Sequence, residues 1–477
     1  MNRPNVLIIG GGISGLSTAW WLARCGIGVE IWEAGERPGG KIRTTREQGY
    51  LTERAAGLLV NHRPEIDRLV LESGLEAGKS VQPDNLNRYV LRQGQLVRVP
   101  MEAPALIASN LWSWQTKVRL MSEMLIPRGG HESETVAEFI TRRFGREVLE
   151  TTIEPFIAGT LASDVDQASA QAVLPRLTEL ERRFGSITMG MLVRRFIRRH
   201  RVNCAETFSF RNGMSELVDT LGTAPGVKLR SGLKVVSISR EGSSWRVVAD
   251  STEGRHIMCT PQLVLSIPAD NASEVLRETS GELASLVGGI DYAPLAVLHL
   301  GFQRNQIRQQ LDGTGFLVPR QEGIGFNGNI WMSGLFPERA PEGHALLSTY
   351  LGGTRHPGQL DQDDMTMMEN VLSGLSPLMG IRGLPDYVRI DRHPKGLPLY
   401  HGDYPARIEQ IRHCLEKLPG LHINANYIDG VSVRERIFQS MRTANKVSKQ
   451  IDGRENAQRR RVSAGHPVVP SSQATGI

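Results

Sequence analysis

A short glycine-rich run near the amino terminus has the residue types and spacing needed to bind the phosphates of a nucleotide. It reads Gly10-Gly11-Gly12-Ile13-Ser14-Gly15, which is a G-x-G-x-x-G pattern. In such a pattern the first glycine permits a tight turn, the second lets the backbone approach a pyrophosphate, and the third allows close helix–strand packing. Glu33 stands about 20 positions after Gly12, where an acidic side chain accepts hydrogen bonds from ribose hydroxyls.

The residues around this run predict the elements that must hold it in place. An apolar run over residues 6–9 is typical of a buried parallel strand. Apolar residues at helical spacing follow over 16–23, and Gly26 ends the helix. Residues 29–33 predict a second strand that ends in Glu33. This β-α-β order indicates a dinucleotide site rather than a simple tight turn. The pattern does not by itself separate FAD from NAD.

Composition and the other reactive residue types narrow the function further. The chain has 477 residues, 40% of them hydrophobic and 22% charged, with a net charge of +6. This is a globular composition of two or three domains, and it does not indicate a nucleic-acid partner. The four cysteines have no C-x-x-C spacing, and the twelve histidines form no ligand pattern. We therefore expect no metal, no disulfide framework and a reducing, cytoplasmic setting. No catalytic acid–base set is recognisable.

A second glycine turn follows the acidic residue. Residues 37–43 read Arg-Pro-Gly-Gly-Lys-Ile-Arg, and they resemble the R-x-G-G-K/R segment of FAD-binding oxidoreductases of the amine oxidase and phytoene desaturase type. Further segments resemble, in order, the protoporphyrinogen/coproporphyrinogen oxidase family. They are Asn87-Arg88-Tyr89-Val90, residues 139–147, residues 175–186, Gly315-Phe316-Leu317-Val318-Pro319-Arg320, residues 336–341 and Tyr427-x-x-Gly430-Val431-Ser432-Val433.

The resemblance implies how the chain holds FAD. The implied cofactor residues are Gly10, Gly11, Gly12, Ile13, Ser14, Gly15, Glu33, Ala34, Gly39, Gly40, Lys41, Ala55, Ala56, Gly57, Leu58, Val235, Val431, Ser432 and Val433. Val235 would meet the adenine through its backbone, and residues 431–433 would lie at the flavin ring.

The resemblance also implies a substrate and an activity. A porphyrinogen, protoporphyrinogen IX before coproporphyrinogen III, would be oxidised to the porphyrin with oxygen as acceptor. Arg88 would pair with a substrate carboxylate, because a guanidinium can bind a carboxylate through two parallel hydrogen bonds. Leu317, Ile330 and Tyr350 would enclose the macrocycle, and Ser163 stands where the family has a glycine whose carbonyl faces the substrate.

The implied fold is α/β, with a discontinuous Rossmann-like FAD-binding domain, an α+β substrate domain and a helical insertion. We assign 1–82, 208–270 and 413–452 to the FAD-binding domain, and 83–100 and 271–412 to the substrate domain. The arginine-rich helical insertion is 101–207, and 453–477 is predicted to be a disordered tail. The basic amphipathic pattern of the insertion allows peripheral contact with the inner face of the cytoplasmic membrane. A homodimer is left open.

Several positions depart from the family pattern, and they keep other functions open. Ala55-Ala56 replaces Gly-Pro, Ala425-Asn426 replaces Gly-Asn, and His393 stands where Trp is common. One alternative is a divergent FAD-dependent amine oxidase or desaturase that acts on another reduced pyrrole or amine. We see no aromatic pair near the C-terminal flavin segment, which disfavours an amine oxidase. The other alternative is a FAD-stabilised binding protein without catalysis.

Overall fold

A five-stranded parallel sheet lies at the centre of the FAD-binding part. The computed structural model describes residues 5–100, 105, 108–131, 133–197 and 206–464. The strands of the sheet, in spatial order, are β10 (Val227–Arg230), β2 (Val29–Trp32), β1 (Val6–Ile9), β14 (Gln262–Leu265) and β20 (Leu421–Ile423). Every pairing is parallel, and β1, β2 and β14 are buried along their whole length. Three distant parts of the chain thus form one sheet, which confirms the discontinuous Rossmann-like fold.

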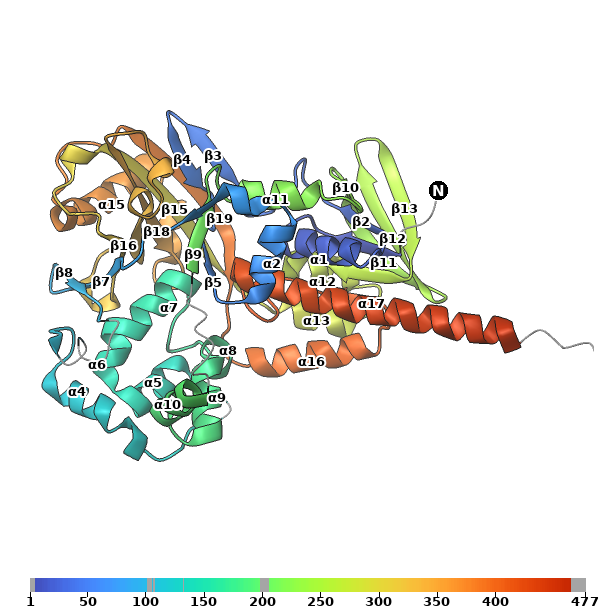
Figure 1. The fold of residues 1–477 in the computed structure, drawn as a ribbon, viewed down its shortest axis with the longest axis horizontal. Coiled ribbons are helices and arrows are strands. Elements are labelled where there is room, and N and C mark those ends of the chain that lie inside the picture. Colours follow the sequence, from blue (N-terminus) through green and yellow to red (C-terminus); the bar gives the residue numbers. More distant parts are fainter. Residues whose placement is uncertain (1–4, 101–104, 106–107, 132, 198–205, 465–477) are drawn as a thin grey trace, which may run out of the picture.

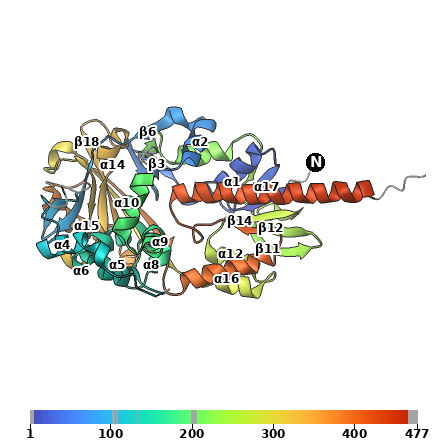
Figure 2. The ribbon, with the colours of Figure 1, turned by 60° about the horizontal axis from the view of Figure 1, so that its bottom comes forward.

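Helices cover both faces of this sheet (Figures 1 and 2). On one face, α1 (Ile13–Arg24) packs along α17 (Val433–Ala464), and the Ser17 hydroxyl donates to the Ser440 hydroxyl at 2.8 Å. The same core includes α2 (Pro64–Glu72) and α11 (Ser215–Gly222). On the other face lie α12 (Ala269–Leu276), α13 (Gly281–Gly288), α16 (Tyr404–Glu416) and the antiparallel sheet of β11 (Lys234–Glu241), β12 (Ser244–Ser251) and β13 (Gly254–Thr260).

This packing moves two of the predicted domain boundaries. The buried core of the FAD-binding part contains residues of α13 and α16, among them Leu283, Val287, Ile408 and Ile411. The boundaries predicted at 270 and 413 leave these residues in the substrate domain. The prediction fails there because α13 and α16 carry apolar faces, and nothing in their local sequence indicates which sheet those faces cover.

A second, mixed sheet of seven strands forms the substrate-side part. Its strands, in spatial order, are β19 (Tyr387–Pro398), β15 (Tyr292–Gln303), β18 (His344–Gly352), β17 (Gly328–Trp331), β16 (Gly313–Leu317), β7 (Asn87–Arg92) and β8 (Gln95–Arg98). The helix α15 (Asp364–Met379) packs on one face through Met367, Val371 and Leu375. Smaller elements join the two parts. The strands β3 (Thr44–Glu47) and β4 (Tyr50–Glu53) form a two-stranded sheet, and α14 (Met332–Leu335) is a short helix. A three-stranded sheet has β9 (Glu206–Phe210) at its centre, between β5 (Leu59–Asn61) and β6 (Lys79–Val81).

The helical insertion packs beside the second sheet (Figure 1). It comprises α4 (Trp114–Met121), α5 (Val136–Phe144), α6 (Arg146–Val148), α7 (Glu154–Leu161), α8 (Ala170–Val173), α9 (Pro175–Phe184) and α10 (Ile187–Ile197). Glu123 is fully buried, accepts hydrogen bonds from the backbone N–H groups of Ile187 (3.2 Å) and Thr188 (3.0 Å), and pairs with buried Arg143. Burial alone would raise the pKa of Glu123, but hydrogen bonds from the Ser186 hydroxyl, from Thr188 and from Arg143 hold it down to about 2. The carboxylate thus fixes the start of α10.

The carboxyl-terminal helix is longer than the sequence predicts. Helix α17 continues to Ala464, through the first part of the segment 453–477 that is expected to be a disordered tail. The prediction is wrong for 453–464, where a charged, apolar-poor sequence extends a helix that is already nucleated by its packed first turns. Residues 465–477 lie outside the described residues, as do Arg198, Arg199 and Arg201 of the arginine-rich run.

Two buried ion pairs connect the three parts of the molecule. Glu53 at the end of β4 accepts a hydrogen bond from Arg339 Nη1 at 2.7 Å, and both side chains are buried. The same carboxylate accepts from the Met214 backbone N–H at 2.8 Å. Between the insertion and the second sheet, Glu154 of α7 pairs with Arg355, whose Nη1 also donates to the carbonyl of Val318 at 2.7 Å. These bonds fix the walls between which the main cavity lies.

We predict that Arg339→Met lowers the free energy of unfolding by about 3–5 kcal/mol, because it leaves the Glu53 carboxylate buried without its cation. Chemical denaturation of the purified protein measures the loss. Arg46→Met is the matched control, since Arg46 is exposed and its replacement changes stability by about 0.5 kcal/mol or less. A loss at Arg339 no larger than that of the control would show that the pair does not hold the parts together.

Candidate functional site: a glycine-lined dinucleotide cavity

The glycines of the first turn have two different environments, one closely packed and one open. A Cβ on Gly10 would lie 2.5 Å from the carbonyl oxygen of Ser266, and one on Gly15 would lie 2.0 Å from the carbonyl oxygen of Gly10. Neither position has room for a side chain. A Cβ on Gly12 would meet no atom within 4 Å, and Gly12 lines the cavity. Gly12 is also the N-cap of α1 and offers no side-chain cap, so the N–H groups of that helix end face open space.

Glu33 lies directly after β2 and lines the same cavity. Its Oε2 accepts a hydrogen bond from the Gly11 N–H at 2.6 Å, and its Oε1 accepts from the Gly35 N–H at 2.8 Å. The carboxylate therefore holds the glycine turn in addition to the expected role toward ribose. Two oxygens have about four acceptor positions, so capacity remains for hydroxyl donors.

The second glycine turn packs directly on the first. Gly39 forms an isolated parallel bridge with Gly12, and its N–H donates to the carbonyl of Gly11 at 2.7 Å. Lys41 Nζ donates to the carbonyl oxygens of Lys395 (2.5 Å) and Gly396. Burial lowers the pKa of Lys41 to about 8, against the opposing effect of Asp270. Lys41 lines the cavity and ties the second turn to β19.

These turns form one wall of a cavity of about 2490 Å³. Single small-molecule sites are usually about 300–1,000 Å³, so this cavity has room for a dinucleotide and a further large molecule. Most of the predicted site residues line it. They are Gly10, Gly12, Ile13, Ser14, Glu33, Ala34, Gly39, Gly40, Lys41, Ala55, Ala56, Gly57, Leu58, Val235, Leu317, Ile330, Tyr350, Val431, Ser432 and Val433. Gly11 and Gly15 are not in its lining.

The second sheet contributes an apolar slot to this cavity. Leu317 of β16 and Tyr350 of β18 lie on either side of Gly328 of β17, which pairs with both of them. A Cβ on Gly328 would lie 2.9 Å from the carbonyl oxygen of Phe316 and 3.2 Å from Leu317 Cδ2, so the absence of a side chain lets Leu317 pack closely over this strand. Ile330 lies on the same strand two residues later, so its side chain points to the same face. Burial raises the pKa of the Tyr350 hydroxyl to about 12, so it stays protonated at neutral pH.

Two predicted substrate residues lie outside the cavity lining. Ser163 is buried, and its hydroxyl is 2.8 Å from His401 Nε2, so it is held away from the cavity. Arg88 is exposed at the start of β7. Its strand runs parallel to β16, with Val90 opposite Leu317. Since side chains alternate along a strand, Arg88 and Val90 share the face of Leu317. Arg88 is therefore beside the slot but not in its wall.

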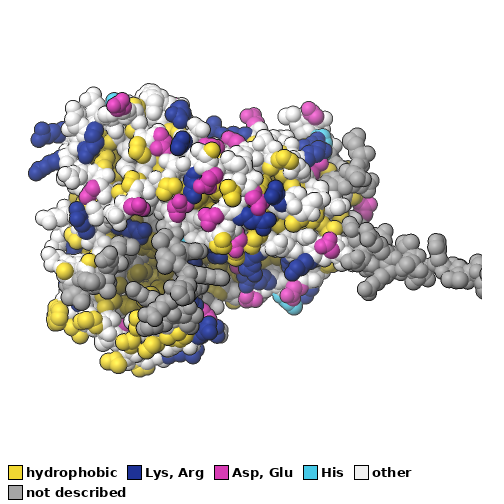
Figure 3. Space-filling view, viewed as in Figure 1, with side chains coloured by type: hydrophobic (Ala, Val, Ile, Leu, Met, Phe, Trp, Pro, Cys, Tyr) yellow, Lys and Arg dark blue, Asp and Glu magenta, His cyan; other side chains and the backbone are white. Residues whose placement is uncertain are grey.

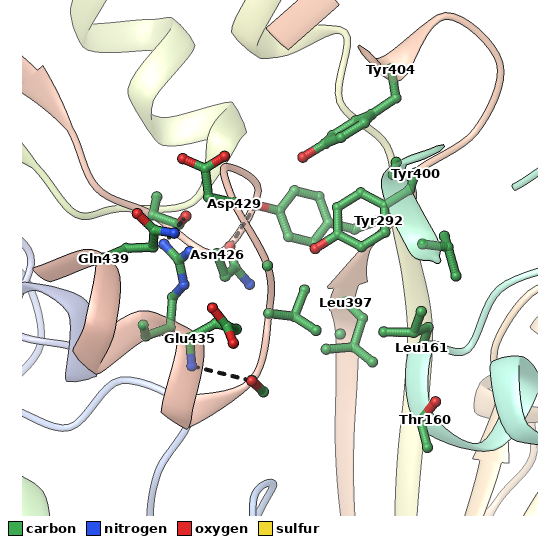
Figure 4. Close-up of a pocket in the computed structure, with 18 of the residues that line it drawn as sticks. Thr160, Leu161, Tyr292, Leu397, Tyr400, Tyr404, Asn426, Asp429, Glu435 and Gln439 are labelled. Carbon is green, nitrogen blue, oxygen red and sulfur yellow. Dashed lines mark hydrogen bonds between the residues drawn. The ribbon is translucent and has the colours of Figure 1, made fainter. Parts of the chain in front are cut away.

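The loop before α17 also lines the cavity, and a buried arginine holds it in place. Arg436 donates to the carbonyl oxygens of Ala425 and Ile428, the latter at 2.5 Å. Figure 4 shows Tyr292 and Asn426 facing one another, and the Tyr292 hydroxyl donates to Asn426 Oδ1 at 3.3 Å. The segment 431–433 is thereby held against the cavity at the start of α17.

A tyrosine pair in this region is missing from the sequence prediction. The rings of Tyr400 and Tyr404 are 4.7 Å apart between centroids and inclined at 68°. Both line the cavity close to Asp429 and Asn426 (Figure 4). The Tyr404 hydroxyl donates to the carbonyl of Tyr427 at 2.7 Å, while the buried Tyr400 hydroxyl has no hydrogen-bond partner among the described residues. The expectation of no aromatic pair beside the C-terminal segment is wrong. The signal was Tyr400 within Pro398-x-Tyr400, whose partner lies four residues later.

The residues present fit a dinucleotide. Gly12 leaves an open cradle, the end of α1 supplies N–H donors and a partial positive charge, and Glu33 supplies a carboxylate at the end of β2. The phosphates would lie at Gly12 and the ribose near Glu33. The remaining space extends past residues 55–58 to the apolar slot.

We predict that Gly12→Val abolishes FAD retention while the protein remains folded. The Cβ at this position meets no protein atom, so the added side chain enters the space of the phosphates without a clash in the protein. Flavin absorbance of the purified protein and its circular dichroism together measure the effect. Gly28→Val is the control, because that site is also free of contacts and lies outside the cavity. Full flavin content in Gly12→Val would place the phosphates elsewhere.

Comparison with known proteins supports this geometry. Residues 13–444 match the family described as flavin containing amine oxidoreductase. The chain is 28% identical to protoporphyrinogen oxidase 2 of Arabidopsis thaliana over 96% of each chain. It is 26% identical to coproporphyrinogen III oxidase of Bacillus subtilis, over 92% of this chain and 96% of that one. A solved structure from Exiguobacterium sp. matches with a TM-score of 0.77 at 24% identity, over 95% of this chain and 100% of that one.

The family match spans most of the chain and includes the helix that follows the glycine turn and the start of α17. The cofactor of the site is accordingly FAD, and the reading of the chain as a binding protein without catalysis is set aside. The chain belongs to the flavin containing amine oxidoreductase family and is a FAD-dependent oxidoreductase.

Proposed function

We propose that this protein oxidises a porphyrinogen to the corresponding porphyrin, with oxygen as the electron acceptor. Protoporphyrinogen IX is the first expected substrate and coproporphyrinogen III the second. One observation carries the proposal: the glycine cradle and the apolar slot of Leu317, Ile330 and Tyr350 belong to one continuous cavity. The names of the relatives from Arabidopsis thaliana and Bacillus subtilis agree with this substrate class.

The slot is suited to a large, flat, apolar ring. Leu295, Val297, Leu317, Ile330 and Tyr350 all line the cavity, and these five side chains include no acid and no imidazole. Bound FAD supplies the hydride acceptor and passes the electrons to oxygen. The protein positions the ring and excludes water. A pyrrole N–H could donate a hydrogen bond to a backbone carbonyl, and its proton would leave to water at the mouth of the slot, so no side chain is assigned as a base.

The proposal gives Arg88 the role of binding a substrate carboxylate at the edge of such a ring. Arg88 of β7 lies on the same face of the second sheet as Leu317 of β16. The strand β16 lies between Arg88 and Ile330 of β17, and its residue opposite Ile330 is Gly315, which has no side chain there. The Arg88 side chain is exposed, and its guanidinium can form two parallel hydrogen bonds to a carboxylate. This arrangement keeps the charge in water while the ring enters the slot.

We predict that a porphyrinogen bleaches the bound flavin under anaerobic conditions and yields a fluorescent porphyrin in air.

Arg88→Ala should raise KM by roughly 10-fold or more, because a hydrogen bond to a charged group contributes roughly 1.5–3 kcal/mol. Flavin content should not change. Arg98→Ala is the control, because Arg98 lies on the adjacent strand and pairs with Asp312. Flavin-loaded protein that leaves the porphyrinogen at its background oxidation rate would contradict the proposal.

The Tyr400–Tyr404 pair supports a second candidate, an amine oxidase or desaturase acting on another reduced pyrrole or amine. The two rings are in edge-to-face contact and line the cavity beside the C-terminal flavin segment, where an amine could pack against them. The two rings are inclined at 68° and do not form a pair of parallel faces that could enclose an amine. We therefore rank the porphyrinogen proposal first. Anaerobic reduction of the flavin by simple amines, with no reduction by porphyrinogens, would reverse this order.

The helical insertion offers a surface for a membrane. Trp114, Val118 and Met121 point to one side of α4, and Leu125, which is 84% exposed, follows them. Met189, Met191 and Leu192 of α10 are also exposed. Figure 3 shows apolar side chains gathered on this end of the molecule with Lys and Arg at their edge. Among the described residues no helix has the length and apolarity to span a bilayer. We propose peripheral contact with an acidic lipid surface.

We predict that Leu125→Asp combined with Met191→Asp strongly reduces co-sedimentation with vesicles that contain an acidic phospholipid, because each change places a carboxylate at the lipid boundary. Leu384→Asp is the control, since Leu384 is 72% exposed in the substrate-side part. Oxidase activity on dissolved substrate should be unchanged in both variants. Equal co-sedimentation of the double variant and the control would contradict the proposed contact between the insertion and a membrane.

A further inference from the structure

Three arginines converge on one wall of the cavity where the insertion meets the FAD-binding part. Arg63 precedes α2, Arg176 is near the start of α9, and Arg434 is in the first turn of α17. All three line the cavity, as does Glu435. Three guanidinium groups and one carboxylate leave the cluster with excess positive charge. The partial positive charge at the start of α17 adds to it.

The cluster holds more hydrogen-bond donors than acceptors. Glu435 is engaged by Arg63 Nη2 at 2.9 and 3.0 Å. Arg176 Nη2 lies 2.7 Å from His62 Nε2, and Arg434 Nη1 lies 3.3 Å from His62 Nδ1. A neutral imidazole has one acceptor nitrogen, so it can accept from only one of these guanidinium groups. Arg434 has two further acceptors, because its Nη1 donates to the carbonyl of Val60 at 2.7 Å and its Nε donates to Glu435 Oε1 at 3.4 Å. Arg63 Nε is buried and has no hydrogen-bond partner among the described residues.

The proposed FAD contacts do not include these three arginines, although Arg434 directly follows residues 431–433, which are assigned to the flavin ring. The phosphates are assigned to Gly12 and the end of α1, and the ribose to Glu33, whereas the three arginines come from α9, α17 and the loop before α2. Arg88, the carboxylate partner proposed above, is on β7 in the second sheet. An acceptor-poor group of arginines in the wall of a cavity is suited to an anion with planar oxygens, because the guanidinium fork matches a carboxylate.

We propose that Arg63, Arg176 and Arg434 form a second substrate-carboxylate site, which binds a carboxylate other than the one at Arg88. The inference rests on the proposed function, since it takes the ligand to be a tetrapyrrole acid in the same cavity. The carboxylate would accept hydrogen bonds from Arg176, which faces only the single acceptor nitrogen of His62, and from Arg434, which Val60 and Glu435 hold beside it. Arg63 would stay paired with Glu435 and add charge.

Equilibrium binding of protoporphyrin IX and of its dimethyl ester to the FAD-loaded protein tests this site, because the ester keeps the ring and removes the charges. We expect Arg176→Gln and Arg434→Gln each to weaken binding of the acid by roughly 10-fold, as loss of a charged hydrogen bond does. Binding of the ester and flavin content should be unchanged. Arg183→Gln is the matched control, since Arg183 lies on α9 and is absent from the cavity lining.

The binding experiment distinguishes failure of the second carboxylate site from failure of the proposed function. Unchanged binding of the acid in both variants would overturn the second carboxylate site, and so would an equal loss for acid and ester, which would indicate a damaged apolar slot. Loss of flavin from Arg434→Gln would assign the cluster to the cofactor and also overturn the site. If the unaltered protein binds neither acid nor ester, the proposed function fails, and this inference fails with it.

Discussion

The close packing of two glycine turns is the constraint on which the rest of the site depends. Gly39 bonds to the backbone at Gly11 and Gly12, and Gly15 packs on the carbonyl of Gly10 with no room for a Cβ. Glu33 then holds the turn through the Gly11 N–H. These contacts use the backbone and leave Gly12 and the end of α1 open. A dinucleotide can therefore approach the main chain without any rearrangement of side chains.

The cavity exists because three parts of the chain are fixed relative to one another. Glu53 and Arg339 join the FAD-binding part to the substrate-side sheet, and Glu154 and Arg355 join the insertion to that sheet. Lys41 adds a bond from the second glycine turn to β19. A buried ion pair contributes little net stability, but it is costly to break, so it suits a joint that must keep one geometry. The apolar slot at Gly328 is thereby held in the same cavity as the glycine cradle.

Local sequence patterns predicted much of the FAD-binding part of the site and less of its substrate-side part. The β-α-β unit, Glu33 and residues 431–433 follow from spacing and resemblance, because their roles use the backbone and a short range of sequence. The extent of α17 and the place of α13 and α16 depend on packing against distant strands, which local sequence does not contain. Ser163 is turned away by a bond to His401, and the Tyr400–Tyr404 pair and the Arg63–Arg176–Arg434 cluster arise only when separate segments meet.

A crystal structure of the FAD-loaded protein soaked with protoporphyrin IX tests the central claim, that the glycine cradle and the apolar slot serve one reaction. The account predicts phosphate density at Gly12 and the start of α1, with the macrocycle between Leu317, Ile330 and Tyr350 and one meso position directed at the flavin ring. A macrocycle bound outside this slot, or FAD phosphates bound away from Gly12, would contradict it.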